Sequence, residues 1–175
     1  MSDSIILELS DITIEILYAA DLPNVIELER QTVGAQSTEQ YHMLTREEHY
    51  ELIDQGVYIG AKYQQKIIAF SSMRFHAAEE LFCGIHINEP FVSFVNTLVH
   101  AKFRGKGLQF LLQKQREKLA QQKGYQIIMA TVSPENQHSL RNVEKFGFSI
   151  VETRDLSKGK RHIVCKKLEI ELDAT

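Results

Sequence analysis

The residues with the clearest chemical potential form the run Arg104-Gly105-Lys106-Gly107-Leu108-Gln109. Glycines let the backbone turn sharply at the end of a strand, and they leave N–H groups pointing outward at the first turn of a following helix. Those amides carry partial positive charge, and Arg104 and Lys106 add full charges. The run therefore predicts a binding site for the pyrophosphate of a phosphorylated cofactor. A plain strand-to-helix turn with solvated basic residues is the alternative.

Two familiar phosphate-binding motifs do not fit this run. The sequence holds no GxxxxGK[ST] segment, and Phe110 stands where a GxGxxG pattern beginning at Gly105 requires its third glycine. Both the P-loop hydrolases and the enzymes that bind NAD through that fingerprint are therefore disfavoured.

The neighbouring elements place the run between a strand and a helix. Residues 91–99 form a β-rich segment that leads into it, and an amphipathic helix follows up to Gly124. Residues 127–132 form a short apolar strand, so the two strands should be parallel and joined by a right-handed crossover. The core face of this helix is expected at Leu108, Leu111, Leu112, Gln115 and Leu119, with Lys114, Arg116, Glu117 and Lys118 on its other faces.

The rest of the chain predicts a mixed α/β arrangement in a single domain over residues 1–175. A capping box, Thr45 with Glu48, opens a helix that ends near Gly56. Residues 76–90 show no clear period and are expected to be irregular. The other expected strands are 13–17, 57–63, 67–75, 148–153 and 161–168, and the other expected helices are 21–30 and 137–146.

Composition bounds the class of protein. The formal net charge of -3 lacks the basic excess of a typical nucleic-acid binder, and the basic stretch at residues 158–167 indicates a solvated edge. We expect no signal peptide, no membrane span and a cytoplasmic location. Cys83 and Cys165 form no CxxC pair, so no metal site and no disulfide framework is expected.

Two motifs in order resemble the GCN5-related N-acetyltransferase (GNAT) superfamily. Its signature is arginine or glutamine, two variable residues, glycine, a variable residue, then glycine or alanine. Arg104, Gly107 and Gln109 stand at these positions here, and the glutamine departs from the pattern. Downstream, residues 136–139 and 144–148 resemble the family's asparagine-to-glycine-phenylalanine motif. The resemblance implies an acyl-CoA N-acyltransferase fold with about seven mostly antiparallel strands, a central splayed parallel pair and about four helices.

The resemblance also implies a cofactor and a reaction. Acetyl-CoA would serve as co-substrate, with its pantetheine arm against the backbone of Leu98 and Val99. The amides of Arg104, Gly105, Lys106, Gly107, Leu108 and Gln109 would bind the pyrophosphate, and Asn136 and Ser139 would contact the pantetheine or a phosphate. A neutral primary amine would attack the thioester directly in a ternary complex, with a backbone N–H near Val99 polarising the carbonyl.

The catalytic acid and base stay unassigned. Val143 stands where many members of the family carry a tyrosine, and residues 93–98 contain no carboxylate. Histidine titrates near neutrality, so His100, which lies next to the run 104–109, is the first candidate base. His86, His138 and Glu89 are further candidates.

The acceptor has no readable motif. The resemblance assigns acceptor choice to residues 30–48 and 76–90, and we expect an amine of a small, amino-acid-like metabolite. A protein N-terminus, a lysine side chain, and a non-catalytic acyl-CoA-binding module are the alternatives. The last strand, if its edge is exposed, can pair with a second copy to form a homodimer.

Overall fold

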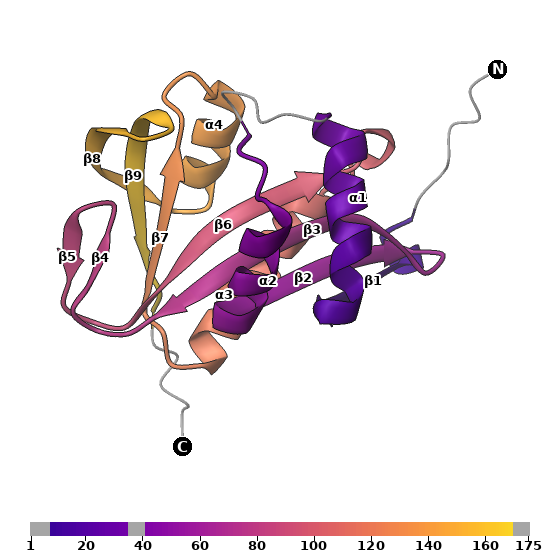
Figure 1. Ribbon diagram of the computed structural model, residues 1–175, viewed down its shortest axis with the longest axis horizontal. Coiled ribbons are helices and arrows are strands. Elements are labelled where there is room, and N and C mark those ends of the chain that lie inside the picture. Colours follow the sequence, from indigo (N-terminus) through magenta and orange to yellow (C-terminus); the bar gives the residue numbers. More distant parts are fainter. Residues whose placement is uncertain (1–7, 35–40, 170–175) are drawn as a thin grey trace.

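The computed structural model describes residues 8–34 and 41–169. Within these residues, one sheet of seven strands runs in the order β1-β2-β3-β6-β7-β9-β8 (Figure 1). Its strands are β1 (Ile12–Leu17), β2 (Gly56–Tyr63), β3 (Lys66–His76), β6 (Phe91–Val99), β7 (Ile127–Val132), β8 (Ser149–Leu156) and β9 (Gly159–Lys167). The helices are α1 (Leu22–Val33), α2 (Arg46–Gln55), α3 (Leu108–Gln122) and α4 (Gln137–Lys145). Three short 3₁₀ turns cover Leu9–Asp11, Ala19–Asp21 and Ala101–Phe103.

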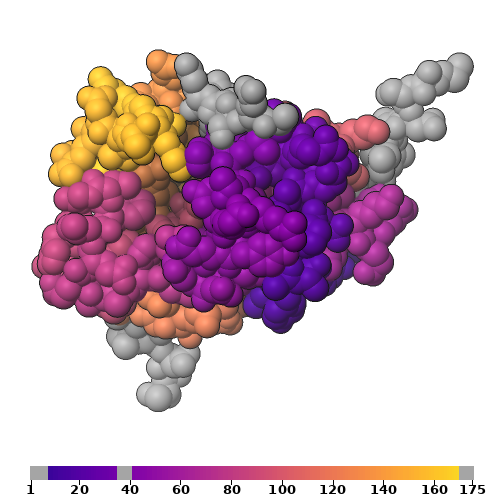
Figure 2. All heavy atoms as spheres, in the orientation of Figure 1, coloured from indigo at the N-terminus to yellow at the C-terminus, as the bar shows by residue number. Residues whose placement is uncertain are grey.

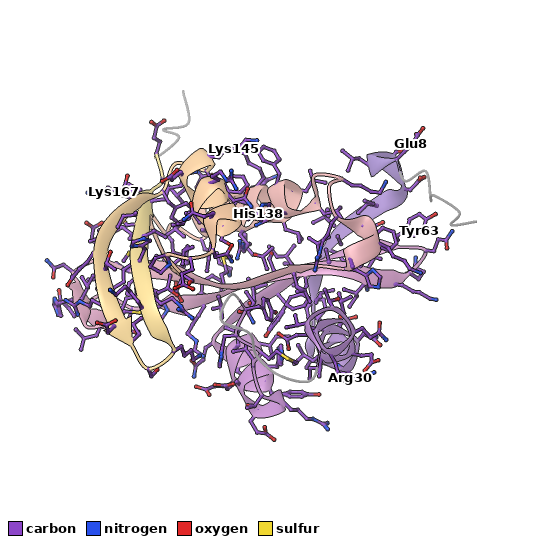
Figure 3. All side chains as sticks on the ribbon, turned by 90° about the horizontal axis from the view of Figure 1, so that it is seen from above. Glu8, Arg30, Tyr63, His138, Lys145 and Lys167 are labelled. Carbon is purple, nitrogen blue, oxygen red and sulfur yellow. The ribbon has the colours of Figure 1, made fainter. Side chains whose placement is uncertain are left out.

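Helices cover both faces of the sheet. Figure 3, which looks along the sheet, shows α1 and α2 on one face and α3 and α4 on the other. The strand alternation explains this division, because successive side chains of a strand point to opposite faces. Tyr58 packs with the buried residues of α1 and α2, whereas Ile59 packs with Leu108 and Leu112 of α3. The central strands of the sheet are therefore buried on both sides, whereas the edge strand β8 is mostly exposed.

The centre of the sheet contains its one described parallel pair, β6 with β7. These strands are paired over only three residues each, from Phe91 with Ile127 to Ser93 with Met129. Both strands continue beyond that point, to Val99 and Val132, without further pairing to each other. The two strands therefore separate toward their carboxyl ends, as the resemblance implied.

The structure confirms the mixed fold with seven sheet strands, one parallel pair and four helices. The capping box also forms, since Thr45 Oγ1 accepts a hydrogen bond from the Glu48 N–H at 3.2 Å. No helix of the described part of the chain is long and apolar enough to cross a membrane. Over the same residues no cluster of potential metal ligands occurs, and both cysteines are free.

Three details differ from the expectations. Residues 76–90 are not wholly irregular, because β4 (Glu80–Phe82) and β5 (Ile85–Ile87) form a small hairpin. The C-terminal strand β9 pairs with β7 and β8, so it has no free edge, and the free edge at this end belongs to β8. On α3, Arg116 and Glu117 are buried and Gln115 is exposed, the reverse of the helical-face prediction.

The reversal on α3 has a polar cause. The Arg116 guanidinium lies 3.9 Å from the centre of the Phe94 ring, and it donates to the Ser72 carbonyl at 3.2 Å and to Gln113 Oε1 at 2.7 Å. Glu117 accepts from Lys166 of β9 at 2.8 Å. Hydrogen-bonded partners thus offset the cost of burying these charges, which periodicity cannot reveal.

Candidate functional site

The run 104–109 forms a sharp turn that opens α3. Gly105 and Gly107 adopt φ values of 74° and 78°, in the left-handed region that favours glycine. A Cβ at either glycine would meet no atom within 4 Å, so both face open space. Gly107 is the N-cap of α3, and no side chain caps the helix there. The first amides of α3 therefore remain available to an anion.

The two basic residues of the run lie differently. Arg104 is exposed, and its Nε donates to the Val99 carbonyl at 3.3 Å. This bond ties the turn to the end of β6. Lys106 is half-buried and does not line the cavity beside the turn.

That cavity, here called the loop cavity, has a volume of about 630 Å³. Its walls come from the end of β6, the turn and first residues of α3, and α4, with α1 and Tyr41 at one side. The predicted cofactor residues among its lining are Leu98, Val99, Arg104, Gly105, Gly107, Leu108, Gln109, Asn136 and Ser139. The structure therefore brings together every predicted cofactor residue except Lys106.

A second cavity, the gap cavity, has a volume of about 380 Å³ and lies where β6 and β7 separate. Residues of both strands line it, and Tyr41, Thr97 and Asn136 are among those it shares with the loop cavity. Phe82 of β4, Lys158 and Arg161 also contribute. Figure 2 shows a hollow on the corresponding face, between the purple 41–60 region, the rose β4–β5 segment and the yellow C-terminal hairpin.

Helix α4 closes one side of the loop cavity. Asn136 is its N-cap, and the Asn136 Oδ1 accepts from the Ser139 N–H at 3.0 Å. Asn142 Nδ2 donates to Gln109 Oε1 at 3.1 Å, so the Gln109 side chain turns toward α4. Asn142 and Phe146 line both cavities and were not predicted. They follow Ser139 by three and seven residues, a spacing that puts all three on one side of α4 and its C-cap, and this was the available signal.

The candidate bases are scattered. His138 lines the loop cavity and lies 3.2 Å from Asn142 Nδ2. His100 lines neither cavity, and its Nδ1 accepts from the Lys102 N–H at 3.2 Å. His86 pairs with Glu79 at 3.1 Å on the β4–β5 side, and Glu89 is exposed. Among the described lining residues of the two cavities there is no carboxylate.

Two buried donors in the gap cavity have no partner in the part of the chain that the structure describes. These are Nδ2 of Asn96 and Nε of Arg116. Burial lowers the pKa of Arg116 to about 9. A ligand carbonyl entering the gap between the strands can accept hydrogen bonds from such groups, which would otherwise stay unpaired at a free-energy cost.

A second polar group lies on the other face of the sheet. Glu29 of α1 and His49 of α2 are both 0% exposed, and His49 Nε2 lies 3.0 Å from Glu29 Oε2. Tyr41 donates to Glu29 Oε1 at 2.6 Å. Sequence reasoning missed this group, although Glu29 follows Val25 by four residues and His49 precedes Leu52 by three, so both lie on apolar helix faces.

Comparison with known proteins identifies the family. Residues 22–148, well over half of the chain, match the model of the acetyltransferase (GNAT) family. The chain belongs to this family, and it is an acetyltransferase with the acetyl-CoA chemistry that the family shares. No curated protein matches the sequence.

Solved structures share the fold at low identity. Ribosomal-protein-S18-alanine N-acetyltransferase from Escherichia coli aligns with a TM-score of 0.68 at 14% identity, over 94% of this chain and 98% of that one. Arabidopsis thaliana Naa50, in complex with the bisubstrate analogue CoA-Ac-MVNAL, gives 0.70 at 16%, over 90% and 99%. A GNAT acetyltransferase from Elizabethkingia anophelis with acetyl-CoA bound gives 0.67 at 18%, over 90% and 99%.

Proposed function

We propose that the protein transfers an acetyl group from acetyl-CoA to the primary amine of a small metabolite, by direct attack in a ternary complex. The observation that carries this proposal is the turn at residues 104–109. It presents the uncapped first turn of α3 to a cavity that continues into the gap between β6 and β7. The pyrophosphate would occupy the turn, and the pantetheine arm would extend toward the gap.

The end of β6 supports the position of the thioester. In a strand, the N–H and C=O of one residue point to the same side. The Val99 carbonyl accepts from Arg104, away from β3, whereas the next N–H, that of His100, donates to Ile68 of β3 at 2.9 Å. The Val99 N–H is thus directed to the gap side. There it can donate to the acyl oxygen as negative charge develops.

The rim of the gap cavity supports an acceptor that carries a carboxylate. Lys158 and Arg161 line this cavity, and so does His42. Burial, followed by the charge of Lys158, lowers the pKa of His42. An amino-acid-like amine would place its carboxylate toward this basic rim and its amine toward the gap. A protein N-terminus, as in the name of the Escherichia coli structure, is the second candidate.

Donor binding is tested by thermal unfolding of the purified protein with acetyl-CoA, CoA, ATP and NAD. A ligand at about 100 times its Kd adds about 2.7 kcal/mol, which raises Tm by several degrees. We expect acetyl-CoA and CoA to raise Tm and ATP and NAD to leave it unchanged. An intact protein that none of the four stabilises would contradict the proposed site.

Acceptor choice is tested by free-thiol release from acetyl-CoA. The panel contains free amino acids, the matching amines that lack the carboxylate, and a peptide with an N-terminal alanine. We expect thiol release above background hydrolysis with free amino acids, and a lower kcat/KM with the matching amines. A preference for the peptide would favour the protein N-terminus. Donor binding without turnover of any member of the panel would contradict the proposed small-metabolite acceptor.

A further inference from the structure

A chain of four buried or half-buried polar side chains runs through the packing between the sheet and the helices α1 and α2. Tyr58 of β2 lies 2.7 Å from His49 Nδ1, and His49 Nε2 lies 3.0 Å from Glu29. The other Glu29 oxygen accepts from Tyr41 at 2.6 Å. Four groups from three elements and one connecting segment thus form a continuous hydrogen-bonded path.

This path crosses an otherwise apolar cluster. Leu22, Val25, Leu28, Leu52 and Phe70 surround it, each of them buried. Burying a carboxylate and an imidazole among such residues is unfavourable unless each polar atom finds a partner, and apolar residues of similar size often replace such pairs without loss of stability. Core packing alone therefore does not require these four residues.

The path ends at the ligand site. Tyr41 lines both the loop cavity and the gap cavity, and it is the one member of the four that does so. Burial, and then the charge of Glu29, raises the pKa of the Tyr41 hydroxyl, so this group keeps its proton and donates it to Glu29. The neutral Tyr41 hydroxyl can accept a proton only if it gives its own proton to Glu29 at the same time. Glu29 lies directly behind it.

We infer that Tyr41 and Glu29 form a relay that accepts the proton lost by the attacking amine. The inference rests on the proposed transfer function. As the C–N bond forms and the C–S bond breaks, the amine proton passes to the Tyr41 oxygen while the Tyr41 hydroxyl proton passes to Glu29 Oε1. The electron pair of the C–S bond leaves with the CoA sulfur. Glu29 becomes the neutral acid, and Tyr41 ends with one proton as it began.

His49 is a positioning residue in this relay. With its proton on Nε2, His49 donates a hydrogen bond to Glu29, and its Nδ1 accepts a hydrogen bond from the Tyr58 hydroxyl. Both ring nitrogens of His49 therefore have a hydrogen-bond partner. The relay also explains how a carboxylate can accept the proton although none is among the described lining residues, because Glu29 is reached through Tyr41. Val143, at the position of the family's tyrosine, takes no part.

Other charged groups near the path are few in the described residues. Burial, and then the charge of Glu29, raises the pKa of Tyr58, while Arg74 on β3 lowers it. The charge of Glu29 also acts on His42, which lines the gap cavity, and raises the pKa of that histidine against the larger lowering by burial. A pH profile must therefore be measured on variants of Tyr41 and Glu29 themselves, with these neighbours unchanged.

The relay is tested by comparing the kinetics of Tyr41→Phe and Glu29→Gln with those of the unaltered protein. The acceptor is the amine of the panel described above that gives the fastest thiol release. Tyr50→Phe is the matched control, because Tyr50 packs on the same cluster yet lines neither cavity. We expect kcat to fall by about 100-fold in both relay variants, since a positioned proton acceptor contributes at least about that factor. The KM for acetyl-CoA and the rise in Tm that acetyl-CoA causes should stay unchanged, and the pH profile of kcat should change in both relay variants.

Each outcome decides one question. A Tyr41→Phe protein with unaltered kcat and unaltered pH profile would overturn the relay and leave the transfer function standing. Equal losses in Tyr41→Phe and Tyr50→Phe would also overturn it, because the effect would then be one of packing. If the unaltered protein releases no thiol with any amine of the panel, both the transfer function and the relay are wrong.

Discussion

The two walls of the proposed ligand site would recognise their ligands by different means. The donor wall consists of the turn at 104–109, the end of β6 and the start of α4, and it offers mainly backbone groups held open by Gly105 and Gly107. The acceptor wall consists of side chains from segments far apart in sequence, among them Tyr41, Phe82 and Arg161. Backbone recognition needs glycine at fixed positions, whereas side-chain recognition leaves no fixed spacing. Separate substitutions should therefore impair donor binding and acceptor recognition independently.

The largest effect is expected behind the acceptor wall, in His49→Leu. The substitution leaves the Glu29 carboxylate buried without its imidazole partner, which lies at 3.0 Å in the unaltered protein. Removing one partner of a buried pair lowers the free energy of unfolding by about 3–5 kcal/mol. Urea unfolding measures the change. The double variant Glu29→Leu with His49→Leu, which removes the buried charge as well, should recover much of the loss, and equal stability of the single variant would disprove the argument.

The donor wall should be broken by Gly107→Glu. A side chain at φ 78° strains the backbone, and its carboxylate lies where the pyrophosphate is proposed to bind. We expect the stabilisation by acetyl-CoA, about 2.7 kcal/mol at 100 times Kd, to disappear. Gly124→Glu is the control, because Gly124 has a φ of 83°, equally open surroundings and a place at the other end of α3. Loss of the ligand effect in both variants would indicate backbone strain rather than a lost anion site.

The contrast between the walls explains what the sequence could predict. The strand at 91–99 and the turn were predictable because each depends on local chemistry, a β-rich run and glycines at positive φ. Asn136 was predicted from the resemblance to the family motif. Of the predicted donor residues, only Lys106 lies outside the lining of the loop cavity. A charged residue in a turn can point either way, so its type alone does not place it.

The buried polar groups could not be predicted, because their partners are distant in the chain. Glu29 and His49 are twenty residues apart, and Arg116 donates to Ser72, forty-four residues away. Helical spacing places Glu29 and His49 on apolar faces, but only the fold shows which distant partner lies within hydrogen-bonding distance. The hairpin within residues 76–90 was not predicted because its two strands have three residues each, too few to show a recognisable alternation.

A smaller effect is expected from Thr45→Ala at the start of α2, the helix that carries His49. Thr45 Oγ1 accepts from the Glu48 N–H at 3.2 Å, and the Glu48 carboxylate accepts from the Thr45 N–H at 2.7 Å. Loss of such a side-chain cap costs about 1 kcal/mol. The bond from the Thr45 backbone lowers the pKa of Glu48. A lowered pKa stabilises the fold above the unfolded value, about 4.3, and the gain is lost as pH falls through the folded value. Thr45→Ala keeps the backbone N–H that donates to Glu48, so urea unfolding should show a difference between the two proteins that stays nearly constant with pH, and a difference that vanishes in acid would show that the Glu48 bond depends on the Thr45 side chain.

The smallest effect is expected for the hydrogen bond between Gln109 of α3 and Asn142 of α4. Gln109 stands where the family signature calls for glycine or alanine, and its side chain accepts from Asn142 at 3.1 Å. If the donor wall acts through backbone amides, Gln109→Ala should keep acetyl-CoA binding. Stability should then fall by about 0.5–1.5 kcal/mol, the contribution of one hydrogen bond.

A double-mutant cycle with Asn142→Ala separates the Gln109–Asn142 bond from other losses, and a coupling energy within that range identifies the bond as the cause. A large fall in acetyl-CoA affinity in Gln109→Ala alone would show that the glutamine side chain contacts the donor. The donor wall would then share the side-chain recognition of the acceptor wall, and the departure of Gln109 from the signature would be functional rather than merely tolerated.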